Sequence, residues 1–272
     1  MVAILETVLG QRTAIETLQR GLASGRSHHA YLFEGPPGVG KERAAFGLAQ
    51  ALLCEQPTNA GLACGSCSAC TRAAPKEPGG LSPHPDVVIL ERGLYEPAQI
   101  GRKSPESKEI SIDQVRTLVL ARAAFPPHEG RAKIFVVRRA DELSISAANA
   151  LLKTLEEPGR NTHFILLTSR KAALLSTIRS RTLSLRFGHL SNAVVARILV
   201  DRGVPETTAA DIAELAGGSV ETALALADPE GRSEIEAFVA RMRDALAATD
   251  AGDGYALAEE GKKGKAELPS LL

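Results

Sequence analysis

One segment, residues 35–42 with the sequence GPPGVGKE, constrains the fold of this 272-residue chain more than any other. A short apolar run, residues 30–34, comes directly before it, and a helical pattern of apolar residues follows it. Strand, glycine-rich turn and helix N-terminus in this order make a P-loop, in which backbone N–H groups and the helix dipole converge on a phosphate. The predicted nucleotide-binding residues of the loop are Gly35, Gly38, Gly40, Lys41 and Glu42.

The residue after the P-loop lysine departs from the usual pattern. A Ser or Thr at this position supplies a hydroxyl to Mg²⁺, whereas this chain has Glu42. A carboxylate can hold Mg²⁺ in principle, but it also places negative charge beside a triphosphate. The loop therefore predicts the fold, and nucleotide binding and hydrolysis are separate questions.

The acidic residues of a hydrolysing P-loop ATPase are also missing. Such enzymes carry carboxylates at the end of a second strand, which hold Mg²⁺ and polarise the attacking water. The strand predicted at residues 133–137 is followed by Arg138 and Arg139 instead. Asp141 and Glu142 come shortly afterwards and would serve only if the strand were longer, so we favour a role in capping or solvating the next loop. We expect weak binding of ATP or ADP, a degraded Mg²⁺ site and no efficient hydrolysis.

Short apolar runs alternate with helical patterns over residues 1–187. Nearly continuous apolar strands are typical of a parallel sheet covered on both faces. We therefore predict an α/β nucleotide-binding domain over residues 1–187, a small three-helix domain over residues 188–229, and the beginning of a further helical domain over residues 230–272. In the first domain, strands are predicted at 30–34, 86–90, 133–137, 163–168 and 183–187, and helices at 13–23, 43–54, 113–124 and 144–157.

Composition argues against several classes of protein. The 32 Lys and Arg residues balance the 32 Asp and Glu residues, so no overall basic field draws this chain to DNA. Tryptophan is absent and aromatic residues make up 4%, which argues against a base-stacking platform. The first 25 residues lack the cationic start and apolar core of a signal peptide, and no stretch has the length of a membrane span. We expect a cytoplasmic protein with no membrane partner.

All four cysteines lie within seventeen residues, in the spacing C-x9-C-x2-C-x2-C. Two-residue gaps let thiolates converge on a tetrahedral ion, and a cytoplasmic chain disfavours disulfides. The alternatives are two disulfides, or reduced thiols without a role. We predict a structural Zn²⁺ in a knuckle over residues 54–70, inserted in the first domain, because four thiolates leave no open position for catalysis. The predicted ligands are Cys54, Cys64, Cys67 and Cys70.

Several motifs together resemble one known family. Over residues 8–228 they occur in the order and at the distances found in the delta-prime subunits of the bacterial DNA polymerase III clamp loader, within the AAA+ superfamily. The most specific stretches are residues 149–158, NALLKTLEEP, and residues 178–182, IRSRT. The other motifs are Gly10-Gln11, the P-loop, the four cysteines followed by His84-Pro85-Asp86, and residues 112–116, IDQVR.

The resemblance implies roles for individual residues. The stretch Ser180-Arg181-Thr182 looks like the Ser-Arg-Cys motif of the family, which would make Arg181 the finger that reaches the γ-phosphate of a neighbouring subunit's ATP. Thr168 falls where the family carries a sensor at the end of its fourth strand. Glu221 stands where the second sensor is normally arginine, which further weakens a nucleotide site in this chain. Residues 230–272 would be the start of the family's helical collar, which we expect to be incomplete.

The resemblance implies a non-hydrolysing clamp-loader subunit within a DNA-directed DNA polymerase, a nucleotidyltransferase. It would assemble with the tau/gamma and delta subunits, present Arg181 to a neighbouring ATPase, and help to place the sliding clamp on primed-template DNA. One alternative is an ATP-hydrolysing motor subunit of the tau/gamma type. Such a subunit should retain the usual residues at the three nucleotide contacts that are altered here, at Glu42, at Arg138 with Arg139, and at Glu221. Another is a stand-alone zinc-dependent nucleic-acid-binding protein, which the charge balance and the scarcity of aromatic residues disfavour.

Overall fold

The computed structural model describes residues 3–101 and 109–228. The expected collar, residues 230–272, lies outside the described residues. The chain divides into two compact units. Of the described residues, the first unit contains those up to Pro36 and those from Gly40 to Gly188, and the second contains Pro37–Val39 and those from His189 to Asp228.

A parallel sheet of five strands forms the centre of the first unit, which confirms the predicted fold class. The strand order is β2-β3-β4-β1-β5. Since β1 lies between β4 and β5, a loop that follows β1 emerges inside the carboxyl edge of the sheet, where ligands of open parallel sheets bind. The strands are β1 (Ala30–Glu34), β2 (Val87–Leu90), β3 (Lys133–Val137), β4 (Thr162–Thr168) and β5 (Leu183–Arg186).

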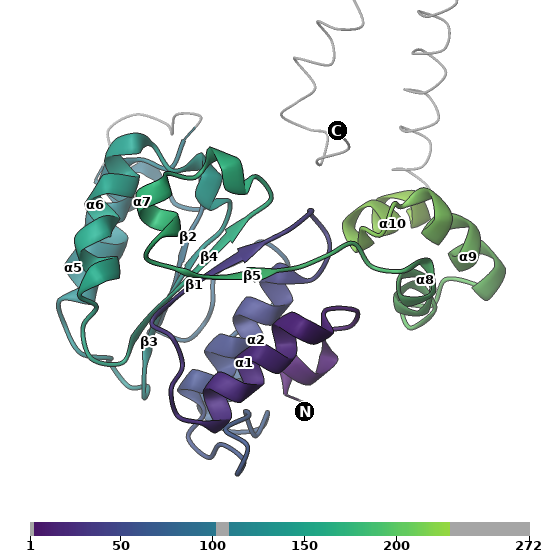
Figure 1. The fold of residues 1–272 in the computed structure, drawn as a ribbon, viewed down its shortest axis with the longest axis horizontal. Coiled ribbons are helices and arrows are strands. Elements are labelled where there is room, and N and C mark those ends of the chain that lie inside the picture. The colour runs from purple at the N-terminus through teal and green to yellow at the C-terminus, as the bar shows by residue number, and fades with distance from the viewer. Residues whose placement is uncertain (1–2, 102–108, 229–272) are drawn as a thin grey trace, which may run out of the picture. The chain divides into compact units, whose positions relative to one another are not determined.

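Helices cover both faces of this sheet (Figure 1). Helices α1 (Arg12–Ala23) and α2 (Lys41–Leu53) lie on one face, and α6 (Ile145–Glu156) and α7 (Ser176–Arg179) lie on the other. The core under α6 includes Phe135 and Phe164, whose rings stack with centroids 5.0 Å apart.

The helix predicted at 113–124 is present but changes its winding along its length. It begins as α4 (Ile112–Gln114), continues as a π-helical segment (Val115–Leu120) and ends as α5 (Ala121–Ala123). The remaining short elements of the first unit are α3 (Ser68–Arg72) and turns of 3-10 helix at Ile4–Thr7, Pro97–Ile100, Ala140–Glu142 and Lys171–Ala173.

Helices α8 (Asn192–Val200), α9 (Glu206–Leu215) and α10 (Val220–Ala227) form the described part of the second unit after residue 188. Ser191 and Ser219 cap α8 and α10, because each hydroxyl accepts a backbone N–H from the first helical turn. Within residues 3–101 and 109–228, no helix combines the length and the apolar character that crossing a membrane requires.

Candidate functional site

The P-loop joins β1 to α2 through backbone conformations that favour glycine. Gly35, Gly38 and Gly40 have φ values of 153°, 70° and 94°. A Cβ on Gly35 would lie 2.1 Å from the carbonyl oxygen of Phe187, so a side chain cannot be accommodated there. Lys41 begins α2, and its Nζ donates a hydrogen bond of 2.7 Å to the carbonyl of Gly35. The predicted loop is therefore formed, with its lysine turned onto the loop itself.

The tip of the loop, Pro37–Val39, belongs to the second unit. The carbonyl of Gly38 accepts the backbone N–H of Val220 at 2.9 Å. A Cβ on Gly38 would lie 2.2 Å from Ser219 Oγ and 2.7 Å from the backbone nitrogen of Glu221. Glu221, which stands at the predicted second-sensor position, thus lies beside the loop tip.

An ion pair connects the two positions from which a P-loop ATPase holds Mg²⁺. Glu42 lies in the first turn of α2, and Arg138 follows directly after β3. Arg138 Nη2 lies 2.5 Å from Glu42 Oε1, and its Nη1 lies 2.9 Å from Glu91 Oε2. The arginine side chain is 4% exposed and that of Glu42 is 45% exposed. A buried guanidinium therefore binds the carboxylate that replaces the Mg²⁺-ligating hydroxyl.

The guanidinium of Arg138 is enclosed on several sides. Its Nη1 donates to the carbonyl of Gly79 at 2.8 Å and its Nη2 to that of Gly80 at 3.3 Å. The guanidinium carbon lies 5.8 Å from the centroid of the Phe46 ring. Nε has no hydrogen-bond partner within the described part of the chain. The positive charge is therefore fixed between the loop at residues 79–80, the end of β2 and the start of α2.

The acids that follow β3 are engaged elsewhere. The strand ends at Val137, and Asp141 and Glu142 lie in a turn of 3-10 helix, which confirms that they belong to the following loop. Asp141 accepts hydrogen bonds from Thr168 Oγ1 at 2.7 Å and from Arg170 Nε at 2.9 Å. Thr168 is buried at the end of β4, between β3 and β1. Its predicted sensor role stays a prediction.

Arg181 lies at the amino-terminal end of the parallel strands, whereas the P-loop lies at their carboxyl-terminal end. It stands two residues before Leu183, which pairs with Tyr31 near the start of β1. The P-loop begins at Gly35, after the end of that strand. Five residues of strand span about 16 Å at ~3.3 Å per residue. The backbone of Arg181 therefore lies about one strand length away from the P-loop of its own chain.

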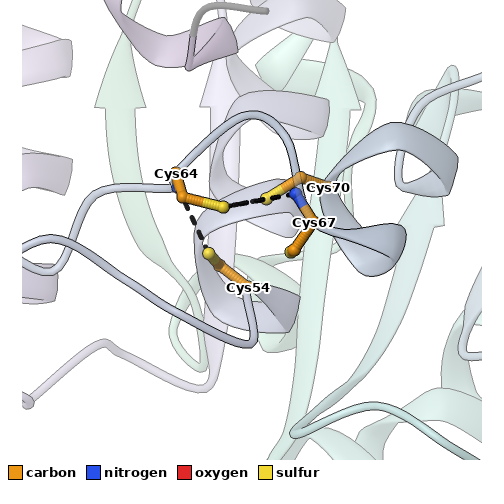
Figure 2. A group of neighbouring side chains, drawn as sticks. All are labelled: Cys54, Cys64, Cys67 and Cys70. Carbon is orange, nitrogen blue, oxygen red and sulfur yellow. Dashed lines mark hydrogen bonds between the residues drawn. The ribbon is translucent and has the colours of Figure 1, made fainter.

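The four cysteines converge beside the end of α2 (Figure 2). Their sulfur atoms all lie within 4.8 Å of one another, and all four thiols are free of disulfides. A tetrahedral ion with Zn–S bonds of about 2.3 Å requires sulfur atoms about 3.8 Å apart, and those of Cys64 and Cys70 are 3.9 Å apart. The predicted ligand set is thus brought together and can hold a metal ion.

The sulfur atoms have contrasting environments. Backbone N–H groups of Ser66 and Cys67 donate to Cys64 and lower its pKa to about 6, which favours the thiolate that metals bind. Burial raises the pKa of Cys54 and Cys70. Their thiolates are therefore costly unless a cation lies among them, as expected for a metal site rather than for four isolated thiols.

A buried amide that the sequence does not single out anchors this knuckle. Gln50 on α2 is 3% exposed, and its Nε2 donates to the carbonyl of Cys70 at 3.2 Å. Its Oε1 accepts the backbone N–H of Ile4 at 2.9 Å. Arg131 Nη1 also donates to the carbonyl of Cys54 at 3.0 Å. The sequence feature that could have indicated Gln50 is its position, as a polar residue, on the apolar face of the predicted helix 43–54.

Two acidic partners of the arginines also escape prediction from sequence. Glu91 holds Arg138, and Glu156 holds Arg181 with an Nε-to-carboxylate distance of 2.6 Å. Each acid stands at the end of an apolar element, since Glu91 directly follows β2 and Glu156 is the last residue of α6. The sequence shows where the strand or helix ends at such an acid, but it does not show which residue the acid binds.

Comparison with known proteins places the chain in a family. The family model described as "DNA polymerase III, delta subunit" matches residues 10–191. The gamma/tau subunit of DNA polymerase III from Mycobacterium tuberculosis is 33% identical over 251 residues, which cover 89% of this chain and 40% of that protein. The delta' subunit from Pseudomonas aeruginosa is 37% identical over 200 residues, which cover 72% of this chain and 54% of that protein. The matches thus span about half of these relatives or less.

A solved structure supports the same fold. A DNA polymerase III gamma subunit-related protein from Thermotoga maritima superposes with a TM-score of 0.50 at 20% identity, covering 94% of this chain and 73% of that chain. At this identity the likeness shows the fold alone, an AAA+ P-loop architecture. Because the family model covers most of the chain and the sequence relatives agree with it, the chain belongs to the DNA polymerase III subunit family of the AAA+ type.

Proposed function

We propose that this chain is a non-hydrolysing clamp-loader subunit of the delta-prime type, which supplies Arg181 to a nucleotide held by a neighbouring subunit. The observation that carries the proposal is the ion pair between Arg138 and Glu42. Hydrolysis needs Mg²⁺ together with a carboxylate at the end of the second strand. Here that position holds a cation, and the residue after the P-loop lysine is its carboxylate partner.

This arrangement also argues against the motor-subunit alternative. The family contains relatives named gamma/tau and relatives named delta', and both resemble this chain. A motor subunit needs acids where this chain has Arg138 and Arg139. The glycine cradle and Lys41 remain, so ATP or ADP can bind weakly without turnover. The active ATP of the complex then belongs to a neighbour.

The position of Arg181 supports action on that neighbour. Arg181 lies about one strand length from its own P-loop, at the amino-terminal end of the strands. A permanently charged, planar guanidinium suits the stabilisation of a phosphoryl group in transfer. The partners of such a subunit are the tau/gamma and delta subunits, and the assembled complex binds the sliding clamp and primed-template DNA in the cytoplasm.

The test is a loader reconstituted with the gamma/tau and delta subunits of the same organism. Arg181→Ala should lower DNA-stimulated ATP hydrolysis at the neighbouring site by up to roughly 10³-fold. Arg179→Ala is the matched control, because Arg179 is an exposed arginine at the end of α7, two residues before Arg181. Unaltered hydrolysis with Arg181→Ala would remove the finger role. ATP turnover by the isolated chain that Lys41→Ala abolishes would favour the motor-subunit alternative.

We also propose that the ion of the knuckle is Zn²⁺. Four cysteine sulfurs form the typical donor set of a structural zinc site. With all four positions filled by thiolates, the ion has no place for water or substrate. Its contribution is to fix residues 54–70 against the end of α2.

A further inference from the structure

Arg181 is held by its own chain. Its Nε donates to Glu156 Oε1 at 2.6 Å, and its Nη2 donates to the same oxygen. Its Nη1 donates to the carbonyl of Thr177 at 2.9 Å and to Ser180 Oγ at 3.3 Å. All three guanidinium nitrogens are thus turned toward the ends of α6 and α7. A finger that reaches a phosphate on another subunit needs these same N–H groups.

The contact lies in an open hollow. Arg181 and Glu156 line a surface depression of about 340 Å³ together with His28 and His29. His29 Nε2 hydrogen-bonds the carbonyl of Leu155 at 2.9 Å, which ties the end of α6 to the segment before β1. The backbone of Glu156 is therefore held in place, and the side chain of Arg181, which follows α7, can turn by rotation about its own bonds. The guanidinium, on a side chain that is partly exposed, can be reached by an anion from solvent.

We propose that Glu156 is a positioning residue that holds Arg181 in a withdrawn orientation until a phosphate on a neighbouring subunit competes for it. This inference rests on the proposed role of Arg181. The two side chains are 30% and 46% exposed, and ion pairs at such sites are weak. A triphosphate offers more charge and more acceptor oxygens than one carboxylate. The guanidinium therefore leaves Glu156 when a subunit that carries ATP docks against this edge.

A purely structural role makes a different prediction. If Glu156 only ties α6 to α7, its loss lowers stability and leaves nucleotide handling by the complex unchanged. If it restrains Arg181, its loss frees the guanidinium and eases its engagement with ATP. The two roles separate in the accessibility of Arg181 and in the KM for ATP.

The first experiment measures accessibility in the full isolated chain. Phenylglyoxal modifies free guanidinium groups, and mass spectrometry of peptides gives the rate at Arg181. Glu156→Gln should raise that rate roughly two- to fivefold. Glu157→Gln is the matched control, since Glu157 is the adjacent acid at the end of the same helix. An equal rate in wild type and Glu156→Gln would overturn the inference.

The second experiment uses the reconstituted loader. Glu156→Gln should lower the KM for ATP roughly two- to fivefold, with the effect on KM rather than kcat, and Glu156→Asp should restore the wild-type KM. In the Arg181→Ala background Glu156→Gln should have no further effect, because the two residues act through one contact. If Arg181→Ala lowers hydrolysis and Glu156→Gln leaves KM unchanged or raises it, the inference fails and the finger role stands. If Arg181→Ala itself has no effect, the proposed function fails.

Discussion

Arg138 and Glu42 are 96 positions apart in the chain, yet the guanidinium Nη2 lies 2.5 Å from the carboxylate oxygen. Arg138 directly follows β3, and Glu42 directly follows the P-loop lysine. In a hydrolysing ATPase these two positions meet through Mg²⁺. Here the guanidinium of Arg138 takes the place of the metal ion and joins the two positions by an ion pair.

Replacing Arg138 with Ala should lower the free energy of unfolding by roughly 1–3 kcal/mol, measured by chemical denaturation. The change leaves two carboxylates without their shared cation. The loss is smaller than for a fully buried pair because Glu42 is 45% and Glu91 20% exposed. Arg139→Ala is the control: this neighbour is 57% exposed, and its loss should cost less than ~0.5 kcal/mol. Equal losses for the two variants would contradict the structural role of the pair.

Replacing Cys67 with Ser should reduce the zinc content from about one ion per chain to nearly none, because a tetrahedral site loses a ligand. The thermal midpoint should fall together with the metal, since zinc binding is coupled to folding. A chelator should produce the same fall in the wild-type chain and no further change in the variant. Elemental analysis and thermal unfolding measure both effects.

Ser66→Ala provides the matched control for the knuckle. Ser66 lies in the same loop, and its hydroxyl is 3.7 Å from the sulfur of Cys64 without being a ligand. This variant should keep its zinc and its sensitivity to chelator. If chelator leaves the thermal midpoint of the wild-type chain unchanged, a structural ion is ruled out.

The sheet could be predicted closely because its signals are local. The apolar runs at 30–34 and 133–137 coincide with β1 and β3, since a strand covered on both faces carries apolar side chains along most of its length. The π-helical segment Val115–Leu120 could not be predicted. Its residues show the ordinary apolar spacing of a helix, and the change of winding depends on packing against the rest of the fold.

In the candidate sites, too, local contacts could be predicted from the sequence and long-range contacts could not. The cysteines could be grouped from sequence because two-residue gaps bring thiols together locally. The partners of the arginines could not, because Glu91 and Arg138 are 47 positions apart and Glu156 and Arg181 are 25 apart. Which end of one element meets which end of another follows from the order of strands in the sheet, and no short spacing encodes that order.

Three histidines should make the stability of the first unit depend on pH. Burial lowers the pKa of His163, of His29 and of His84. The unfolded chain therefore binds protons at a higher pH than the folded chain. The free energy of unfolding should fall as the pH drops through about 6.5. It should level off only when the folded histidines also protonate.

Chemical denaturation at pH values from about 7.5 to about 5 measures this slope. His163→Gln removes one of the three groups and should flatten this slope, whatever the variant does to stability at neutral pH. His189→Gln is the control, because His189 is an exposed histidine of the second unit. An unchanged slope in His163→Gln would show that other groups account for the loss of stability in acid.

The carboxylate of Asp86 organises the loop after the π-containing helix. It accepts backbone N–H groups from His128 at 2.5 Å, Glu129 at 2.9 Å and Gly130 at 2.7 Å. The residue is 1% exposed, and burial by itself would raise its pKa. The three donors outweigh that cost, so the pKa lies below its ordinary value of 3.8. The contribution to stability is therefore present above that pH and is lost as the pH falls through the lowered pKa.

Asp86→Asn should therefore lower the free energy of unfolding at neutral pH by roughly 2–4 kcal/mol, because charge-assisted hydrogen bonds are lost and one amide N–H₂ group then faces backbone donors. Asp211→Asn, at an exposed position of α9, should change it by less than ~0.5 kcal/mol. The difference between wild type and Asp86→Asn should shrink as the pH falls toward the pKa of Asp86, since protonation removes the same charge from the wild-type chain. A difference that stays constant down to pH ~3 would mean that shape, rather than charge, makes this aspartate necessary.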